Sequence, residues 1–198
     1  MDKKQIKEEY EKRKKEIKNK LKSLVKPKTK REIFLELCYC LLVPLSRASK
    51  VYEFLEKNKS SVYLPEKKLA KALRGVCRFH NIKAKYIVEA RKKLKLIDKI
   101  PNDPKEAREF LVRNFKGLGY KEASHFLRNI GYRGLSILDR HILNCLYELG
   151  LIKNKIWKSK KEYLEIEEKM KKLSKELNIS LDELDFLLWS IKTGNILK

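Results

Sequence analysis

Hydrophobic residues recur at helical spacing along almost the whole chain, and the alternation that marks a strand is nearly absent. The first such segment, residues 4–24, is highly charged and has one narrow apolar stripe, which predicts a helix that packs along a single face. Pro27 then breaks it. The stripe consists of Ile6, Tyr10, Ile17, Leu21 and Leu24.

The second segment, residues 31–43, is apolar on nearly all sides and therefore predicts a helix at the centre of the core, ended by Pro44. The last helix begins with Ser180 followed by Glu183, a capping-box pattern. Short connections between the segments suit a compact all-α bundle. The helices are expected over 4–24, 31–43, 47–57, 66–75, 81–96, 104–114, 121–130, 140–150, 159–176 and 181–194.

The composition of the chain indicates what kind of partner it binds. The 198 residues include 49 Lys and Arg against 26 Asp and Glu, a formal net charge of +23, while 42% are hydrophobic. This is a folded basic protein of one domain, or of two tightly associated small ones, and it predicts a polyanionic partner. Nucleic acid is favoured over an anionic membrane.

No stretch has the roughly 18 to 20 uncharged residues that a membrane span needs, and the N-terminus lacks the apolar core of a signal peptide. We therefore expect an intracellular, cytoplasmic protein. The cysteines, Cys38, Cys40, Cys77 and Cys145, contain no C-x-x-C pair and are expected to be reduced thiols in the core.

The segment from Phe115 to Ala123 carries the first candidate chemistry. Gly117 and Gly119, separated by one apolar residue and flanked by helical pattern, allow a tight hairpin. Its backbone N–H groups and the N-terminus of the next helix can face a phosphate, so the hairpin is a candidate DNA contact. An ordinary turn between helices is the alternative.

Lys121 follows the hairpin, and Asp139 ends the loop 131–138 just before another helix. In this arrangement residues 111–145 resemble the helix-hairpin-helix DNA glycosylase superfamily, in which a Gly/Pro-rich loop after the hairpin ends in an essential aspartate. The loop here departs from that pattern because it has two glycines and no proline. The resemblance implies a single glycosylase unit over residues 1–198, with two helical lobes and a cleft between them for a flipped purine.

A lysine at position 121 implies, by the same resemblance, a bifunctional member that cuts the glycosidic bond and then the strand. An amine that attacks C1′ displaces the base and leaves an iminium, which permits β-elimination of the 3′ phosphate. Asp139 would stabilise the positive charge that develops on the sugar. The alternatives are a surface lysine and a helix N-cap, and Asp139 can combine the cap with the catalytic role.

None of the cysteines lies beyond Cys145, so the iron–sulfur cluster of many superfamily members is absent. The short chain and its last residues resemble the small archaeal-type 8-oxoguanine DNA glycosylase/lyases. This implies that Trp189 and the terminal Lys198 hold the damaged base. The Lys198 carboxylate would accept the N7 hydrogen that 8-oxoguanine has and guanine lacks. A half-buried tryptophan and an ordinary chain end are the alternatives.

A short break between two helices contains Arg78, Phe79, His80 and Asn81, and superfamily members fill the gap left by the flipped nucleotide from about this position. Which of the four enters the DNA is not determined by the sequence. His125 and His141 share no metal-ligand spacing with His80 and are expected to be packing or surface residues.

The resemblance thus predicts a monomeric enzyme that acts on double-stranded DNA containing oxidised guanine. It implies no organic cofactor and no side-chain metal site, although some relatives hold a monovalent cation with hairpin carbonyls, here those of residues 116–119. A glycosylase for another damaged base and a non-catalytic helix-hairpin-helix DNA-binding module are the alternative functions.

Overall fold

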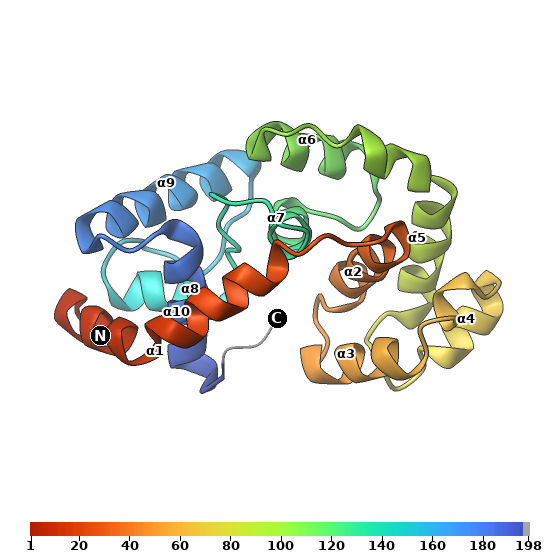
Figure 1. Ribbon diagram of the computed structural model, residues 1–198, viewed down its shortest axis with the longest axis horizontal. Coiled ribbons are helices and arrows are strands. Elements are labelled where there is room, and N and C mark those ends of the chain that lie inside the picture. Colours follow the sequence, from red (N-terminus) through yellow and green to blue (C-terminus); the bar gives the residue numbers. More distant parts are fainter. Residues whose placement is uncertain (196–198) are drawn as a thin grey trace. The chain divides into compact units, whose positions relative to one another are not determined.

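A computed structural model describes residues 1–195, and in this range it contains helices and no strand (Figure 1). The all-α prediction is confirmed. The α-helices are α1 (Lys3–Leu24), α2 (Lys30–Leu42), α3 (Ala48–Lys57), α4 (Glu66–Ala72), α5 (His80–Lys92), α6 (Pro104–Asn114), α7 (Tyr120–Asn129), α8 (Arg140–Glu148), α9 (Lys160–Leu177) and α10 (Leu181–Thr193). Two 3₁₀ helices are η1 (Ser61–Tyr63) and η2 (Leu94–Lys99).

The chain divides into two compact units. The central unit is residues 27–130 and contains α2 to α7, whereas the terminal unit combines residues 1–26 with the chain from Gly131 onward. Each candidate catalytic residue belongs to a different unit, Lys121 to the central one and Asp139 to the terminal one. That the whole chain acts as one glycosylase unit stays a prediction.

Helix α2 lies at the middle of the central unit and packs against α3, α5 and α7 (Figure 1). Its start is fixed by a capping box in which Thr29 and Glu32 satisfy each other's backbone N–H groups. From Phe34 onward nearly every side chain is buried, as the all-round apolar pattern predicts. Even its Glu36 is buried, and it accepts a hydrogen bond from Asn129 of α7 at 3.1 Å.

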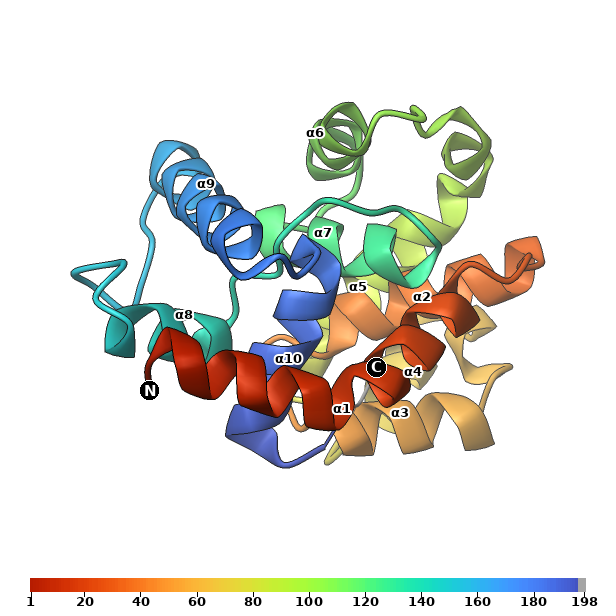
Figure 2. The same cartoon turned by 60° about the vertical axis from the view of Figure 1, so that its left-hand side comes forward.

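In the terminal unit α1 runs along α10 in both views (Figure 1, Figure 2). The predicted stripe of α1 is buried except at Leu21, which is half-buried. Two polar contacts join the same pair of helices, from Arg13 to Ser190 Oγ at 3.1 Å and from Lys18 to Glu183 at 4.0 Å. A charged helix with one narrow apolar face is thus held by that face, which the pattern predicts.

Two predicted helices end three or more residues earlier than expected. The helix expected over 66–75 stops at Ala72, and Gly75 then adopts φ +78°. The helix expected over 81–96 stops at Lys92 and continues as η2. Apolar residues at 94, 97 and 100 recur every third position, and this spacing suits a 3₁₀ helix as well as an α-helix, so the pattern alone does not separate the two.

All four cysteines are buried and free, as expected of core thiols. Burial raises the pKa of the Cys145 thiol to about 11, so it stays protonated near neutral pH. Among the helices of residues 1–195, none is long and apolar enough to cross a membrane.

Candidate active site

The hairpin turns at Gly117, which has φ +89°. A Cβ at this position would lie 2.5 Å from a ring carbon of Tyr86, closer than real Cβ contacts come, and 3.0 Å from a methyl group of Leu41, a tight contact. Leu118 is buried, and its N–H donates to the carbonyl of Phe115 at 3.2 Å. The turn therefore requires glycine at 117 for two reasons, the backbone conformation and the absence of space.

Gly119 is the N-cap of α7 and has an ordinary φ of −87°. Its absent Cβ would meet only the end of the Glu122 side chain, at 3.0 Å, and that end can move. Because glycine has no side chain, no cap accepts from the first N–H groups of α7. These donors at the positive end of the helix dipole suit an anionic ligand.

Lys121 lies in the first turn of α7 with its side chain only 21% exposed, whereas that of Lys116 in the hairpin is 72% exposed. Its Nζ is 2.9 Å from a carboxylate oxygen of Glu122, which is also mostly shielded. Lys121 is therefore not an ordinary surface lysine. Sequence analysis missed Glu122, because side chains of neighbouring residues on a helix do not usually face each other.

Asp139 is the N-cap of α8, as one interpretation of the sequence expected. Its Oδ1 accepts hydrogen bonds from the N–H groups of His141 at 2.8 Å and Ile142 at 2.9 Å. Both cap bonds use the same oxygen, and Asp139 as a whole is only partly buried. The cap thus fixes the carboxylate through one oxygen and leaves the second outside these two bonds.

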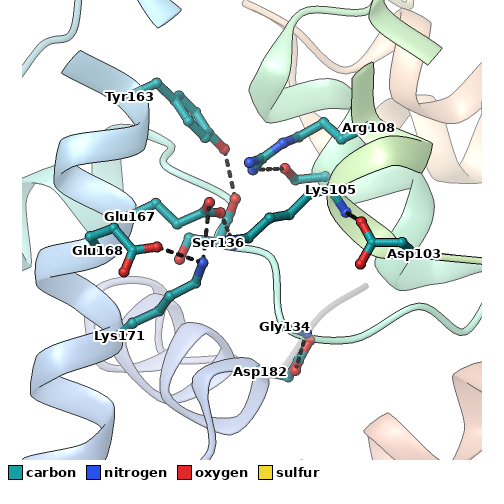
Figure 3. Close-up of polar contacts among 11 residues, drawn as sticks. Asp103, Lys105, Arg108, Gly134, Ser136, Tyr163, Glu167, Glu168, Lys171 and Asp182 are labelled. Carbon is teal, nitrogen blue, oxygen red and sulfur yellow. Dashed lines mark hydrogen bonds and ion pairs between the residues drawn. The ribbon is translucent and has the colours of Figure 1, made fainter. Parts of the chain in front are cut away.

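Three carboxylates hold the loop that leads to Asp139, and we call them the loop carboxylates: Glu167, Asp182 and Asp185. Asp182 accepts from the N–H of Gly134, Glu167 from that of Ser136 and Asp185 from that of Ile137, each at 2.9 Å. Figure 3 shows Ser136 between Glu167 and Tyr163, whose hydroxyl donates to the Ser136 carbonyl at 2.6 Å.

Sequence analysis missed the loop carboxylates because they lie far along the chain from the loop. Asp185, for example, belongs to α10 and lies 48 positions beyond Ile137. In the structure this carboxylate is buried under the loop. An acidic residue between Leu184 and Phe186, in a helix otherwise apolar at this point, was the signal that something polar must cover it.

Trp189 is partly exposed, and its ring lies edge-on to His141 of α8, with the centroids 6.2 Å apart. A half-buried tryptophan is confirmed, and it lies beside the helix that Asp139 caps. His141 is a packing residue, as expected. Lys198, the other residue assigned to the base, lies outside the described residues.

The break between α4 and α5 spans residues 73–79, so the expectation that all of Arg78 to Asn81 lie between helices is wrong for two of them. His80 and Asn81 form the first turn of α5, which begins earlier than expected because Phe79 is its N-cap. Phe79 has φ +57° and is 53% exposed, and the Arg78 guanidinium lies 5.5 Å from its ring centre.

The buried Lys83 fastens this break to the end of α2. Its ammonium donates to the carbonyls of Leu42 at 2.7 Å and Pro44 at 2.6 Å and to Ser46 Oγ at 3.0 Å. Ser46 Oγ also accepts from the N–H of Arg78 at 3.1 Å. Burial lowers the pKa of the Lys83 ammonium, although three acceptors surround it.

No group of three or more His, Cys, Asp or Glu side chains gathers at one point within residues 1–195 in a way that suits a metal ion. His125 instead lies edge-on to the Tyr39 ring, with centroids 5.7 Å apart, which fits the packing role expected for it.

Comparison with known proteins agrees with this arrangement. The family model described as 8-oxoguanine DNA glycosylase matches residues 11–179, a range that includes both Lys121 and Asp139. The 8-oxoguanine DNA glycosylase/AP lyase of Methanocaldococcus jannaschii is 44% identical over 87% of this chain and 86% of its own length. That of Fusobacterium nucleatum is 38% identical over 98% and 94%.

The fold is also similar to a solved structure, the M. jannaschii 8-oxoguanine glycosylase/lyase in complex with a 15mer DNA containing 8-oxoguanine. The TM-score is 0.91 at 37% identity, and the match covers 98% of this chain and all of that one. Sequence, hairpin and fold therefore lead to one conclusion: the chain belongs to the 8-oxoguanine DNA glycosylase family.

Proposed function

We propose that this protein removes 8-oxoguanine from double-stranded DNA through an imine on Lys121 and then cleaves the strand by β-elimination. The observation that carries the proposal is the mostly shielded side chain of Lys121, which follows the glycine hairpin in a chain of this family. An amine sheltered from water and placed beside a phosphate-binding turn is positioned to attack a nucleotide held by its backbone.

The chemistry begins when Lys121 gives up a proton, which the Glu122 carboxylate at 2.9 Å is placed to accept. Nζ then attacks C1′, the bond from C1′ to the base breaks, and the base leaves with the electron pair and gains a proton. A proton then passes from the attached nitrogen to O4′, the bond from C1′ to O4′ breaks, and the nitrogen lone pair forms the C=N bond of the iminium. Asp139 stabilises the positive charge on the sugar as the base leaves.

Strand cleavage follows from the iminium. Loss of a proton from C2′ expels the 3′ phosphate with the electron pair of its C–O bond, and water then hydrolyses the imine and restores the lysine. Strand cleavage does not require a damaged nucleobase to be bound in the site. A pre-formed abasic site is therefore a substrate for Lys121, and it separates strand cleavage from base recognition.

The DNA backbone is proposed to lie at the hairpin, where the uncapped N–H groups that follow Gly119 offer donors to one phosphate. Phe79 is proposed to fill the gap that the flipped nucleotide leaves. It combines an exposed aromatic ring with a strained backbone, and Lys83 is connected to the break that carries it through Ser46, which accepts from the Arg78 N–H. Such rigid apolar side chains can unstack a base step.

The damaged base is proposed to stack on Trp189, whose partly exposed ring lies beside the helix capped by Asp139. The terminal carboxylate of Lys198 is proposed to accept the N7 hydrogen of 8-oxoguanine, on the strength of the family resemblance. We further propose that the protein acts as a monomer, without an organic cofactor, on double-stranded DNA containing oxidised guanine.

The test is to incubate the protein with matched duplexes that contain 8-oxoguanine, uracil, thymine glycol or an abasic site, with and without borohydride. We expect base loss at 8-oxoguanine and covalent trapping on the 8-oxoguanine and abasic duplexes. Faster base loss at another lesion would mean that this lesion, and not 8-oxoguanine, is the substrate of the protein. DNA binding without base loss or trapping would leave a non-catalytic DNA-binding module.

A further inference from the structure

The loop carboxylates take no part in the chemistry proposed above, yet each is almost completely buried. Removing a carboxylate from water is unfavourable unless hydrogen bonds replace the lost solvation. The loop backbone supplies such bonds, since each carboxylate accepts from an N–H of the loop. Glu167 also has a cation nearby, Lys171 Nζ at 3.6 Å.

The loop buries the side chains of residues 135–138, but its backbone has little hydrogen bonding of its own. Gly131 and Gly134 both adopt positive φ, and no proline restricts the backbone. At the end of the loop, the N–H of Asp139 donates a backbone hydrogen bond to the carbonyl of Ile137 at 2.7 Å. A glycine-containing segment of this kind needs bonds from outside to hold a single conformation.

Side chains of the terminal unit supply those bonds, both to N–H groups and to carbonyl groups of the loop. The carboxylates hold the N–H groups of Gly134, Ser136 and Ile137. In addition, the Tyr163 hydroxyl donates to the Ser136 carbonyl at 2.6 Å and the Trp157 indole to the Leu138 carbonyl at 3.4 Å. The backbone is thus held up to the residue before Asp139.

We propose that Glu167, Asp182 and Asp185 are positioning residues that hold the loop and thereby orient the Asp139 carboxylate. This inference rests on the role of Asp139 proposed above. Asp185 has the most direct connection, because it binds the N–H of Ile137 and the carbonyl of Ile137 accepts from the N–H of Asp139. Glu167 and Asp182 act one and three residues further from Asp139.

Two variants of Asp185 separate the roles of acceptor and charge. Asp185→Asn keeps an oxygen that can accept from Ile137, whereas Asp185→Ala leaves that buried N–H without it. We expect Asp185→Ala to slow single-turnover excision of 8-oxoguanine by about tenfold or more, and Asp185→Asn by less than about threefold. Leu184→Ala, a buried position in the same helix without a polar bond to the loop, is the control for general destabilisation.

The decisive arm repeats Asp185→Ala in an Asp139→Asn background. If Asp185 acts through Asp139, the Asp185→Ala substitution causes no further slowing in the Asp139→Asn background, because the carboxylate that Asp185 orients is already absent. Equal slowing in both backgrounds would mean a merely structural role and would overturn the inference. Should Asp185→Ala fail to fold, Asp182→Ala at the loop's far end provides the same double-mutant test.

Backbone amide exchange measured by NMR gives a readout that does not depend on activity. Asp185→Ala should speed exchange at His141 and Ile142, the two amides that Asp139 caps, and leave the middle of α9 unchanged. Unchanged exchange at those amides would contradict the inference. If exchange rises but Asp139→Asn excises normally, the proposed role of Asp139 fails while the positioning of the loop stands.

Discussion

The hairpin before Lys121 and the loop before Asp139 both lead into the N-terminus of a helix, but they are held in different ways. The hairpin depends on a glycine packed so closely against Tyr86 that no side chain fits. The loop also turns at glycines, yet nothing lies within 4 Å of a Cβ placed at Gly134. Buried carboxylates from two other helices hold it instead.

This difference shows how much of each segment is encoded locally. The hairpin has a local signal, because the positive φ of Gly117 by itself favours glycine, although the close contact with Tyr86 comes from another helix. The loop conformation is determined by hydrogen bonds to residues from 31 to 48 positions away. A loop of this kind can keep its conformation without the proline that the superfamily pattern contains.

The largest effect is expected at the end of the hairpin. Lys121→Gln should abolish borohydride trapping on both the 8-oxoguanine and the abasic duplex, because the amide cannot form an imine. Binding to the duplex should stay nearly unchanged, since one charge among 49 basic residues contributes little to the electrostatic attraction. Lys116→Gln, in the same hairpin but exposed, is the matched control and should trap normally.

At the end of the loop, Asp139→Asn should slow base excision by about a hundred- to a thousandfold, the usual effect of losing a group that stabilises transition-state charge. The asparagine oxygen can still cap α8, so fold and DNA binding should persist. Single-turnover kinetics and a melting curve check both points. A near-normal excision rate would reduce Asp139 to a helix cap.

Trp189, in the terminal unit, should matter for base excision and not for strand cleavage. Trp189→Ala should reduce 8-oxoguanine excision by about 10- to 100-fold, since stacking contributes roughly 1 to 3 kcal/mol per base. Cleavage at a pre-formed abasic site should be unchanged, because no base needs recognition there. A few residues added after Lys198 should produce the same asymmetry. Equal loss on both substrates would indicate a general DNA contact or a damaged fold.

Alanine at the glycines gives the smallest effects and compares the two segments directly. Gly117→Ala combines a positive φ with the clash against Tyr86 and should lower the free energy of unfolding by about 2 to 4 kcal/mol. Gly134→Ala has backbone strain alone and should lower it by about 1 kcal/mol. Urea denaturation measures both free energies of unfolding. Equal losses in the two variants would mean that the contact with Tyr86 adds nothing to the cost at Gly117.

The sequence predicted the all-α fold, the buried α2 and the cap at Asp139 because each depends on neighbours within a few turns of one helix. It missed the start of α5 because the left-handed conformation of Phe79, which caps that helix, has no sequence signal in a residue other than glycine. It missed the ion pair of Lys121 with Glu122 and the loop carboxylates because these depend on side-chain directions and on packing between distant segments.

The most direct test of the central claim is to identify the trapped residue. The protein is incubated with a duplex containing 8-oxoguanine in the presence of borohydride, digested with a protease, and the peptide bound to DNA is sequenced by mass spectrometry. We expect one adduct, on Lys121. An adduct on another lysine, such as the buried Lys83, or base loss with no adduct at all, would contradict it.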